Sequence, residues 1–143
     1  MALADLNPRS TSKYLINGDL TAEAGKLLTI KTSDTSTLGV TTLQIATSAA
    51  DLPVGVVVVG AASDTGIYPG YATSCEIYDT LIGCFDGAIA GPGGVTNGQA
   101  VECDGSGTFI TADPVAGSFI VGYALTNAAA GEQFTIKFNV TQF

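Results

Sequence analysis

The chain has 143 residues, enough for one domain with its own core, and its net charge is −8 with no histidine and no tryptophan. Hydrophobic residues make up 46% and charged residues 13%, which argues against disorder. An acidic chain of this kind is expected to be repelled by nucleic acid and by anionic membranes, and it lacks the usual general base near neutral pH. No apolar run approaches the ~20 residues of a membrane helix, and the first ten residues lack the apolar core of a signal peptide. We therefore expect a protein made in the cytoplasm of its host.

Residues 1–17 are predicted to form an extended arm in front of the folded body. Residues 1–12 are polar and have no apolar periodicity, so they should add little to folding. Four of the five basic residues lie in the first 31 positions, whereas the rest of the chain is acidic. Proline also favours extended backbone in the residue before it, which suits strand addition to a partner. We expect the arm to dock on a partner protein through Pro8, Arg9, Lys13 and Tyr14.

Residues 18–143 are predicted to form an all-β body, a small barrel or sandwich. The sequence has 18 glycines and is rich in Val, Thr and Ala, which suits short strands joined by glycine-rich turns. About ten short strands are expected, with hairpins about Asp79-Thr80 and about residues 104–107. In chain order they fall at residues 14–16, 26–31, 40–46, 54–59, 75–78, 81–85, 99–103, 108–111, 119–125 and 133–140.

Two of these strands show which of their faces are buried. Residues 133–140 alternate strictly between polar and apolar side chains, so one face of this strand should lie on the core. Residues 54–59 are apolar on both faces, which is typical of a central strand.

The same short phrase occurs twice and indicates a duplicated β unit. Val54-Gly55 followed by three further strand residues matches Val121-Gly122 at an offset of 67 residues. Upstream, residues 25–28 resemble residues 98–101, and residues 44–47 resemble residues 109–112. The alternative is that short Val, Gly and Ala phrases recur by chance. If the unit is duplicated, Gly55 and Gly122 should occupy equivalent places in two β units.

The region at about residues 61–94 departs from the repeat and is treated as an insertion of loops and a hairpin. It contains Tyr68, Tyr71 and Tyr78. Aromatic side chains of this kind stack on sugars in carbohydrate-binding modules, pack loops down, or contact a partner protein. These tyrosines are therefore candidate contacts for a partner or a glycan.

The sequence offers little for catalysis or metal binding. Carboxylate pairs are conceivable at Asp79 with Asp86 and at Glu102 with Asp104, but we interpret these as solvated turn residues. Residues 104–107 have the start of a calcium loop and lack its further acidic ligands. We expect no enzymatic activity, no cofactor and no metal.

The three cysteines, Cys75, Cys84 and Cys103, form an odd set without a CxxC spacing. In a cytoplasmic product they are expected to be free thiols. The alternative is a Cys75–Cys84 bridge across the predicted hairpin.

Read in order, these phrases resemble the short β-rich capsid decoration (cement) proteins of tailed bacteriophages. The pattern comprises two Gly-opened strands at residues 25–27 and 98–101, an alanine-rich step before Gly55, and the closing phrase at residues 120–131. It covers roughly residues 18–60 and 83–140, and residues 61–78 are longer than the pattern predicts.

The resemblance implies a small β-barrel-like subunit that sits as a homotrimer on the outside of the head and has no catalytic activity. Its partners would be the major capsid protein and further copies of itself, and neither nucleic acid nor a membrane. It would stabilise the head by clamping neighbouring capsid subunits. The alternative function is that of a carbohydrate-binding β-sandwich module.

Overall fold

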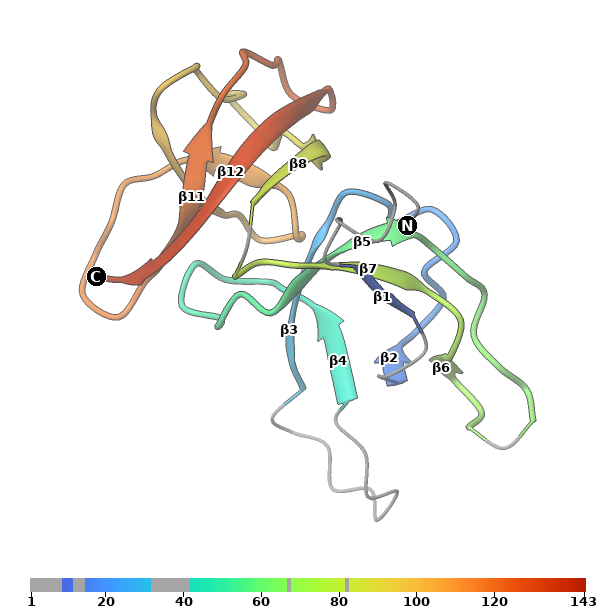
Figure 1. The fold of residues 1–143 in the computed structure, drawn as a ribbon. Helices are drawn as coiled ribbons and strands as arrows, with labels where there is room; N and C mark the ends of the chain where they lie inside the picture. Colours follow the sequence, from blue (N-terminus) through green and yellow to red (C-terminus); the bar gives the residue numbers. More distant parts are fainter. Residues whose placement is uncertain (1–8, 12–14, 32–41, 67, 82) are drawn as a thin grey trace.

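The computed structural model describes residues 9–11, 15–31, 42–66, 68–81 and 83–143, and it places twelve strands in them. The strands form a seven-stranded sheet in the order β1-β7-β5-β3-β4-β2-β6 and a five-stranded sheet in the order β10-β9-β11-β12-β8 (Figure 1). All pairs are antiparallel except β2 with β4. The predicted all-β class is confirmed, and this part of the chain holds no helix that could cross a membrane. The strands are β1 (Arg9–Thr11), β2 (Leu15–Asn17), β3 (Leu27–Ile30), β4 (Thr42–Ile45), β5 (Gly55–Val59), β6 (Tyr71–Ala72), β7 (Glu76–Asp79), β8 (Cys84–Ile89), β9 (Ala100–Cys103), β10 (Phe109–Thr111), β11 (Phe119–Ala124) and β12 (Gln133–Gln142).

The chain passes from the first sheet to the second between β7 and β8. The hairpin predicted about Asp79-Thr80 is therefore wrong, because β7 pairs with β1 and β5 whereas β8 pairs with β12. The carboxylate of Asp79 accepts a hydrogen bond from the backbone nitrogen of Leu81 (2.7 Å), and the turn so formed leads to the other sheet. Asp86 and Gly87, expected in a loop, lie within β8.

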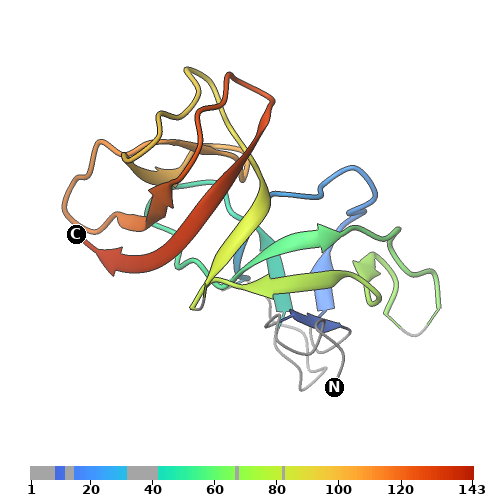
Figure 2. The ribbon, with the colours of Figure 1, turned by 45° about the horizontal axis from the view of Figure 1, so that its top comes forward.

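The seven-stranded sheet is strongly curled. In the strand order β1 and β2 lie five positions apart, which in a flat sheet would separate them by about 24 Å. The four peptide units from Thr11 to Leu15 span at most ~15 Å. The sheet must therefore roll until these strands approach each other, and the two views show this half-barrel (Figure 2).

The curled sheet buries both of its faces at β3 and β5, and this produces two cores. Leu27 and Val56 face the second sheet, whereas their neighbours Leu28 and Val57 face the inside of the half-barrel. The inter-sheet core consists of Leu27, Ala46, Val56, Tyr78, Ala88, Ala90, Val95, Val101, Cys103, Phe109, Val121, Ala124, Ala128, Phe134, Ile136 and Phe138. The half-barrel core consists of Ile16, Leu20, Leu28, Leu43, Val57, Ala72, Cys75 and Ile77.

The predicted faces of two strands are confirmed. Phe134, Ile136 and Phe138 of β12 are buried in the inter-sheet core, and the alternate residues of that strand are more exposed. β5 lies between β7 and β3, in the interior of its sheet.

The two sheets contain the same four-stranded unit. The order β4-β3-β5-β7 in the first sheet corresponds to β10-β9-β11-β12 in the second, and every pair in both is antiparallel. Gly55 of β5 pairs with Leu28 of β3, and Gly122 of β11 pairs with Val101 of β9. The sequence analysis matched Leu28 with Val101, so the two glycines occupy equivalent places as predicted.

Backbone hydrogen bonds repeat in the same way. The nitrogen of Gly25 donates to the carbonyl of Val57 and that of Gly98 to Ala124, both at 2.7 Å. Further matched bonds are Val57 to Lys26 with Ala124 to Gln99, Lys26 to Glu23 with Gln99 to Thr96, and Ala46 to Leu27 with Ala112 to Ala100. Chance recurrence of short phrases would not reproduce these bonds, so the duplication is a property of the fold.

The sequence alignment of one strand pair differs from the structure by one residue. The phrases matched Gln44 with Phe109, whereas the ladders make Leu43 equivalent to Phe109, since they pair with Ile30 and Cys103 respectively. Both side chains are fully buried, so burial rather than the wording of the phrase sets the register.

Two stretches of the predicted arm are strands of the first sheet. β1 pairs with β7, and β2 pairs with both β4 and β6. Leu15 and Ile16 are buried. The strand before each unit has the same role, because β1 flanks β7 as β8 flanks β12. Residues 9–11 and 15–17 therefore belong to the body as well as to the arm.

Candidate functional site

The arm residues predicted to dock are described only in part. Pro8, Lys13 and Tyr14 lie outside the described residues. The backbone of Arg9 opens β1, paired with Tyr78 of β7. The contribution of these four residues to docking stays a prediction.

Tyr78 is a core residue, which corrects its assignment as a surface contact. It is 7% exposed, and its ring packs against Phe85 and Phe138 at centroid distances of 5.4 and 5.7 Å. Its hydroxyl lies beside the Cα of Gly83, where a Cβ would stand 2.7 Å from the phenol oxygen. Burial, reinforced by Cys84 and Asp86, raises the pKa of the Tyr78 phenol. A glycan platform that requires Tyr78 is therefore excluded.

The other two tyrosines lie near the edge strand β6 of the first sheet. Tyr68 and Tyr71 are both half-buried, and the backbone nitrogen of Tyr71 donates to the carbonyl of Tyr68 (3.1 Å). The ammonium of Lys31 lies 3.4 Å from the hydroxyl of Tyr71, 5.3 Å from its ring centroid and 3.4 Å from the Oδ1 of Asn17. The sequence analysis did not single out Lys31, because its partner is 40 residues away in the chain.

This edge has no counterpart in the second unit. The third and fourth strands of the first unit are joined by residues 60–75, which include β6, whereas β11 and β12 are joined by the shorter stretch 125–132. Within the longer connection, the nitrogen of Asp64 donates to the carbonyl of Tyr71 (2.8 Å). The part of the predicted insertion that departs from the repeat is therefore residues 60–75.

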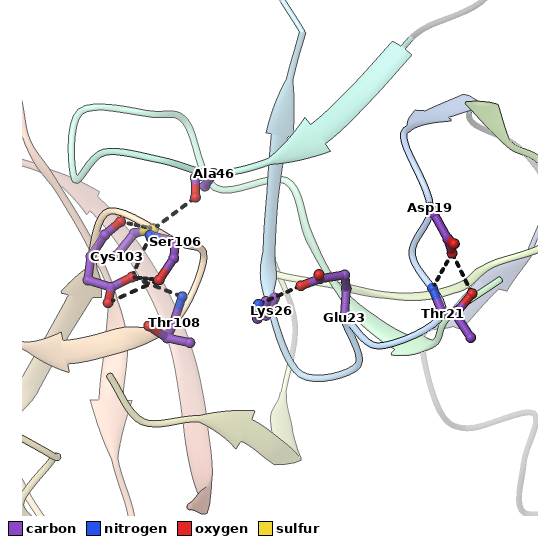
Figure 3. Close-up of polar contacts among 9 residues, drawn as sticks. Asp19, Thr21, Glu23, Lys26, Ala46, Cys103, Ser106 and Thr108 are labelled. Atoms are coloured by element: carbon purple, nitrogen blue, oxygen red, sulfur yellow. Dashed lines mark hydrogen bonds and ion pairs between the residues drawn. The ribbon is translucent and has the colours of Figure 1, made fainter. Parts of the chain in front are cut away.

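The carboxylates singled out in the sequence do not assemble a catalytic pair. Asp104 is a turn residue, since its Oδ1 accepts hydrogen bonds from the backbone nitrogens of Ser106 (2.8 Å) and Thr108 (3.1 Å) (Figure 3). Asp86 accepts a hydrogen bond from the hydroxyl of Thr135 (2.7 Å) on the neighbouring strand. Among the described residues, no group of three or more His, Cys, Asp or Glu is arranged to hold a metal.

Glu102 differs from the other acidic residues because it is buried. It was expected to be solvated, but it is 8% exposed, and its Oε2 has no hydrogen-bond partner among the described residues. A buried polar atom without a partner costs about 1–3 kcal/mol, and more when it is charged.

Replacing this carboxylate is expected to stabilise the fold. Glu102→Met keeps a side chain of similar length and removes the unpaired oxygen, so unfolding should require about 1–3 kcal/mol more. Thermal and urea unfolding measure the change, with Glu132→Met as the control because Glu132 is exposed. A Glu102→Met protein no more stable than the wild type would mean that this carboxylate has a stabilising partner.

The three cysteines are free and differ in burial. Cys84 is exposed, whereas Cys75 and Cys103 are buried. The thiol of Cys103 lies where the two sheets meet and donates to the carbonyl oxygens of Asp104 (3.0 Å) and, more weakly, Ala46 (3.8 Å) (Figure 3). Burial, with the charge of Asp104 beside it, raises the pKa of Cys103 from 9.0 to about 12.

Thiol titration should separate these cysteines. With Ellman's reagent at pH 8, the folded protein should release about one equivalent rapidly, from Cys84, and the unfolded protein all three, because the thiolate is the reactive form. The contribution of Cys103 to stability is complete below pH 9 and is lost as the pH rises toward 12, since the unfolded thiol ionises first. Rapid release of three equivalents from folded protein would contradict the burial of Cys75 and Cys103.

Comparison with known proteins gives a match in structure and none in sequence. No protein-family model matches the chain, and no curated protein matches it. Among solved structures, the chain is similar to the N base of the head fiber protein gp8.5 of bacteriophage phi29, with a TM-score of 0.62 and 17% sequence identity. The match covers 94% of this chain and 96% of that chain. The two chains share a fold. The similarity therefore extends over both β units, including the curled first sheet.

Proposed function

We propose that the protein is a structural component of a tailed-bacteriophage head. The observation that carries this proposal is the similarity, over almost the whole of both chains, to the base of a phage head fiber. It agrees with the family that the order of the sequence phrases resembles. Both point to a small β-rich protein attached to a phage head.

In this proposal the protein sits on the outer surface of the capsid as a homotrimer and clamps neighbouring subunits of the major capsid protein. The body supplies a rigid unit with few charges, and the N-terminal arm supplies a second contact. Three tethered contacts raise the effective concentration of one another, so the trimer binds far more tightly than one copy does. The protein performs no catalysis and requires no cofactor.

The physical purpose of such binding is resistance to internal pressure. A protein that bridges two capsid subunits binds the assembled shell and not the separated subunits, so it shifts the equilibrium toward the intact head. The stabilisation grows with the concentration of the bound protein relative to its dissociation constant.

The test is binding to head shells purified from the parent phage after deletion of this gene. The purified protein should bind such shells saturably and raise the temperature at which they release DNA or disassemble. Light scattering at micromolar concentration should give the mass of three chains of 14.4 kDa. Absence of binding defeats the proposed function, whereas binding by a monomer defeats only the trimer.

A further inference from the structure

Large apolar side chains are exposed on one side of the molecule, where the two sheets meet. Among the described residues, eight large hydrophobic side chains are exposed, and four of them belong to segments that gather there. These four residues, which we name the seam patch, are Leu52, Leu81, Val115 and Phe143, with exposed fractions of 45%, 77%, 65% and 61%.

Hydrogen bonds tie the segments of the seam patch together. The hydroxyl of Thr80, next to Leu81, donates to the carbonyl of Pro53, next to Leu52 (3.2 Å). The nitrogen of Phe119 donates to the carbonyl of Ala49 (2.7 Å), which joins the start of β11 to the loop that contains Leu52. The nitrogen of Gly117 donates to the carbonyl of Phe143 (2.8 Å), which joins the loop of Val115 to the end of β12. In Figures 1 and 2 these loops lie on the side of the molecule that carries the C-terminus.

The duplication explains why the seam patch forms. Gly55 pairs with Asp79 and Gly122 pairs with Phe138, so both units enter their third strand and leave their fourth strand at the same end. The bond between Phe119 and Ala49 places these two ends together. The patch is therefore built from equivalent ends of both units, on a surface that neither unit covers.

The charge around the seam patch has one sign. The four segments that carry it, residues 46–54, 79–83, 113–119 and 139–143, contain three aspartates and no lysine or arginine. The aspartates are Asp51, Asp79 and Asp113. The first two are half-buried and the third is exposed. An apolar centre with an acidic rim is complementary to a surface with an apolar centre and a basic rim.

We propose that the seam patch is the surface through which the body docks on the head shell, onto a region of the capsid protein with apolar side chains bordered by lysine or arginine. This inference rests on the proposed function and adds a contact on the body to that of the arm. The same patch on a second copy is a poorer occupant, because it would bring the three aspartates of one copy against those of the other.

The start of β1 lies at the same end of the first sheet. Arg9 pairs with Tyr78 and Thr11 with Glu76, so the chain enters β1 from the end of β7 that leads to Leu81. The arm and the seam patch can therefore contact one partner surface together. This geometry makes the two contacts cooperative, since binding through one holds the other in place.

The experiment measures binding to head shells that lack the protein. Leu81→Ser with Val115→Ser removes apolar surface from two exposed positions, and Asp113→Lys reverses an exposed charge. The matched controls are Val59→Ser, at the far end of β5 and 51% exposed, and Glu132→Lys, exposed in the turn before β12. All variants should unfold within a few degrees of the wild type, since none of these side chains is buried.

The double serine variant should bind shells at least tenfold more weakly, and the controls within twofold of the wild type. Asp113→Lys should weaken binding most at low salt, where screening is least. Wild-type binding with no loss in the patch variants overturns this inference and leaves the proposed function standing. A patch variant that loses its oligomeric mass while each chain still binds shells would identify the occupant as a second copy, and this also overturns it. Failure of the wild type to bind defeats the proposed function itself.

Discussion

Gly122→Ala is expected to lower the free energy of unfolding by about 3 kcal/mol, among the largest effects of any single methyl group in this fold. Gly122 lies in β11 between β9 and β12. A Cβ there would overlap the carbonyl oxygen of Lys137 and stand 2.9 Å from its carbonyl carbon and 3.0 Å from the Cα of Phe138. These are backbone atoms of a paired strand, which can move only by breaking the ladder. The melting temperature should fall by roughly 6–12 °C.

The duplication provides a matched control for this substitution. Gly55 occupies the equivalent place in the first unit, but a Cβ there would meet the Cγ2 of Ile77 at 2.5 Å and the nearest backbone atom, the carbonyl oxygen of Tyr78, at 3.3 Å. A side-chain methyl can rotate away, so Gly55→Ala should cost clearly less. Gly105→Ala has nothing within 4 Å and should leave stability within about 0.5 kcal/mol of the wild type. Equal stability of Gly122→Ala and Gly105→Ala would show that β11 and β12 are not packed as described.

The parts of the fold that the sequence predicted are those with a strong local pattern. The alternation in residues 133–140 identified the buried face of β12, and the Asp-Gly-Ser-Gly turn identified the hairpin of β9 and β10. The repeated phrase identified the duplication, because the glycine before each third strand is required by a close neighbouring strand. In each case the residues that specify the structure are adjacent in the chain.

The parts that the sequence did not predict depend on partners far away in the chain. Asp79-Thr80 has the residues of a hairpin turn, and nothing nearby indicates that β7 and β8 enter different sheets. Gly87 was expected in a loop, but its carbonyl packs against Gly25 of the other sheet, and β8 continues through it. β1 has no apolar periodicity, since only its backbone pairing with β7 holds it in the sheet.

The candidate site was predictable only as a set of residue types. Exposure decides which aromatic side chains can contact a partner, and it separates Tyr78 in the core from Tyr68 and Tyr71 at the sheet edge. The seam patch has no signature in the sequence at all. Its residues come from separate loops, and they gather because two β units present the same end at one place.

Deletion of residues 1–12 is expected to destabilise the protein as well as to weaken its binding to head shells. The deletion removes β1 and leaves the edge of β7 without its partner at Glu76, Ile77 and Tyr78. The lost ladder bonds should cost about 1–3 kcal/mol, and an uncovered strand edge favours aggregation. The expectation from the sequence, that these residues add little to folding, therefore changes because the strand is part of the sheet.

Charge reversal separates docking from folding in this segment. Arg9→Glu with Lys13→Glu keeps the backbone that pairs with β7, so its melting temperature should stay within a few degrees of the wild type. Its binding to head shells should weaken at least tenfold at low salt and less at high salt, since the arm is predicted to dock through these two charges. The deletion should lose both stability and binding, whereas the charge variant should lose binding alone. A charge variant that binds shells as tightly as the wild type would remove the arm from the docking surface and leave the body as the contact with the shell.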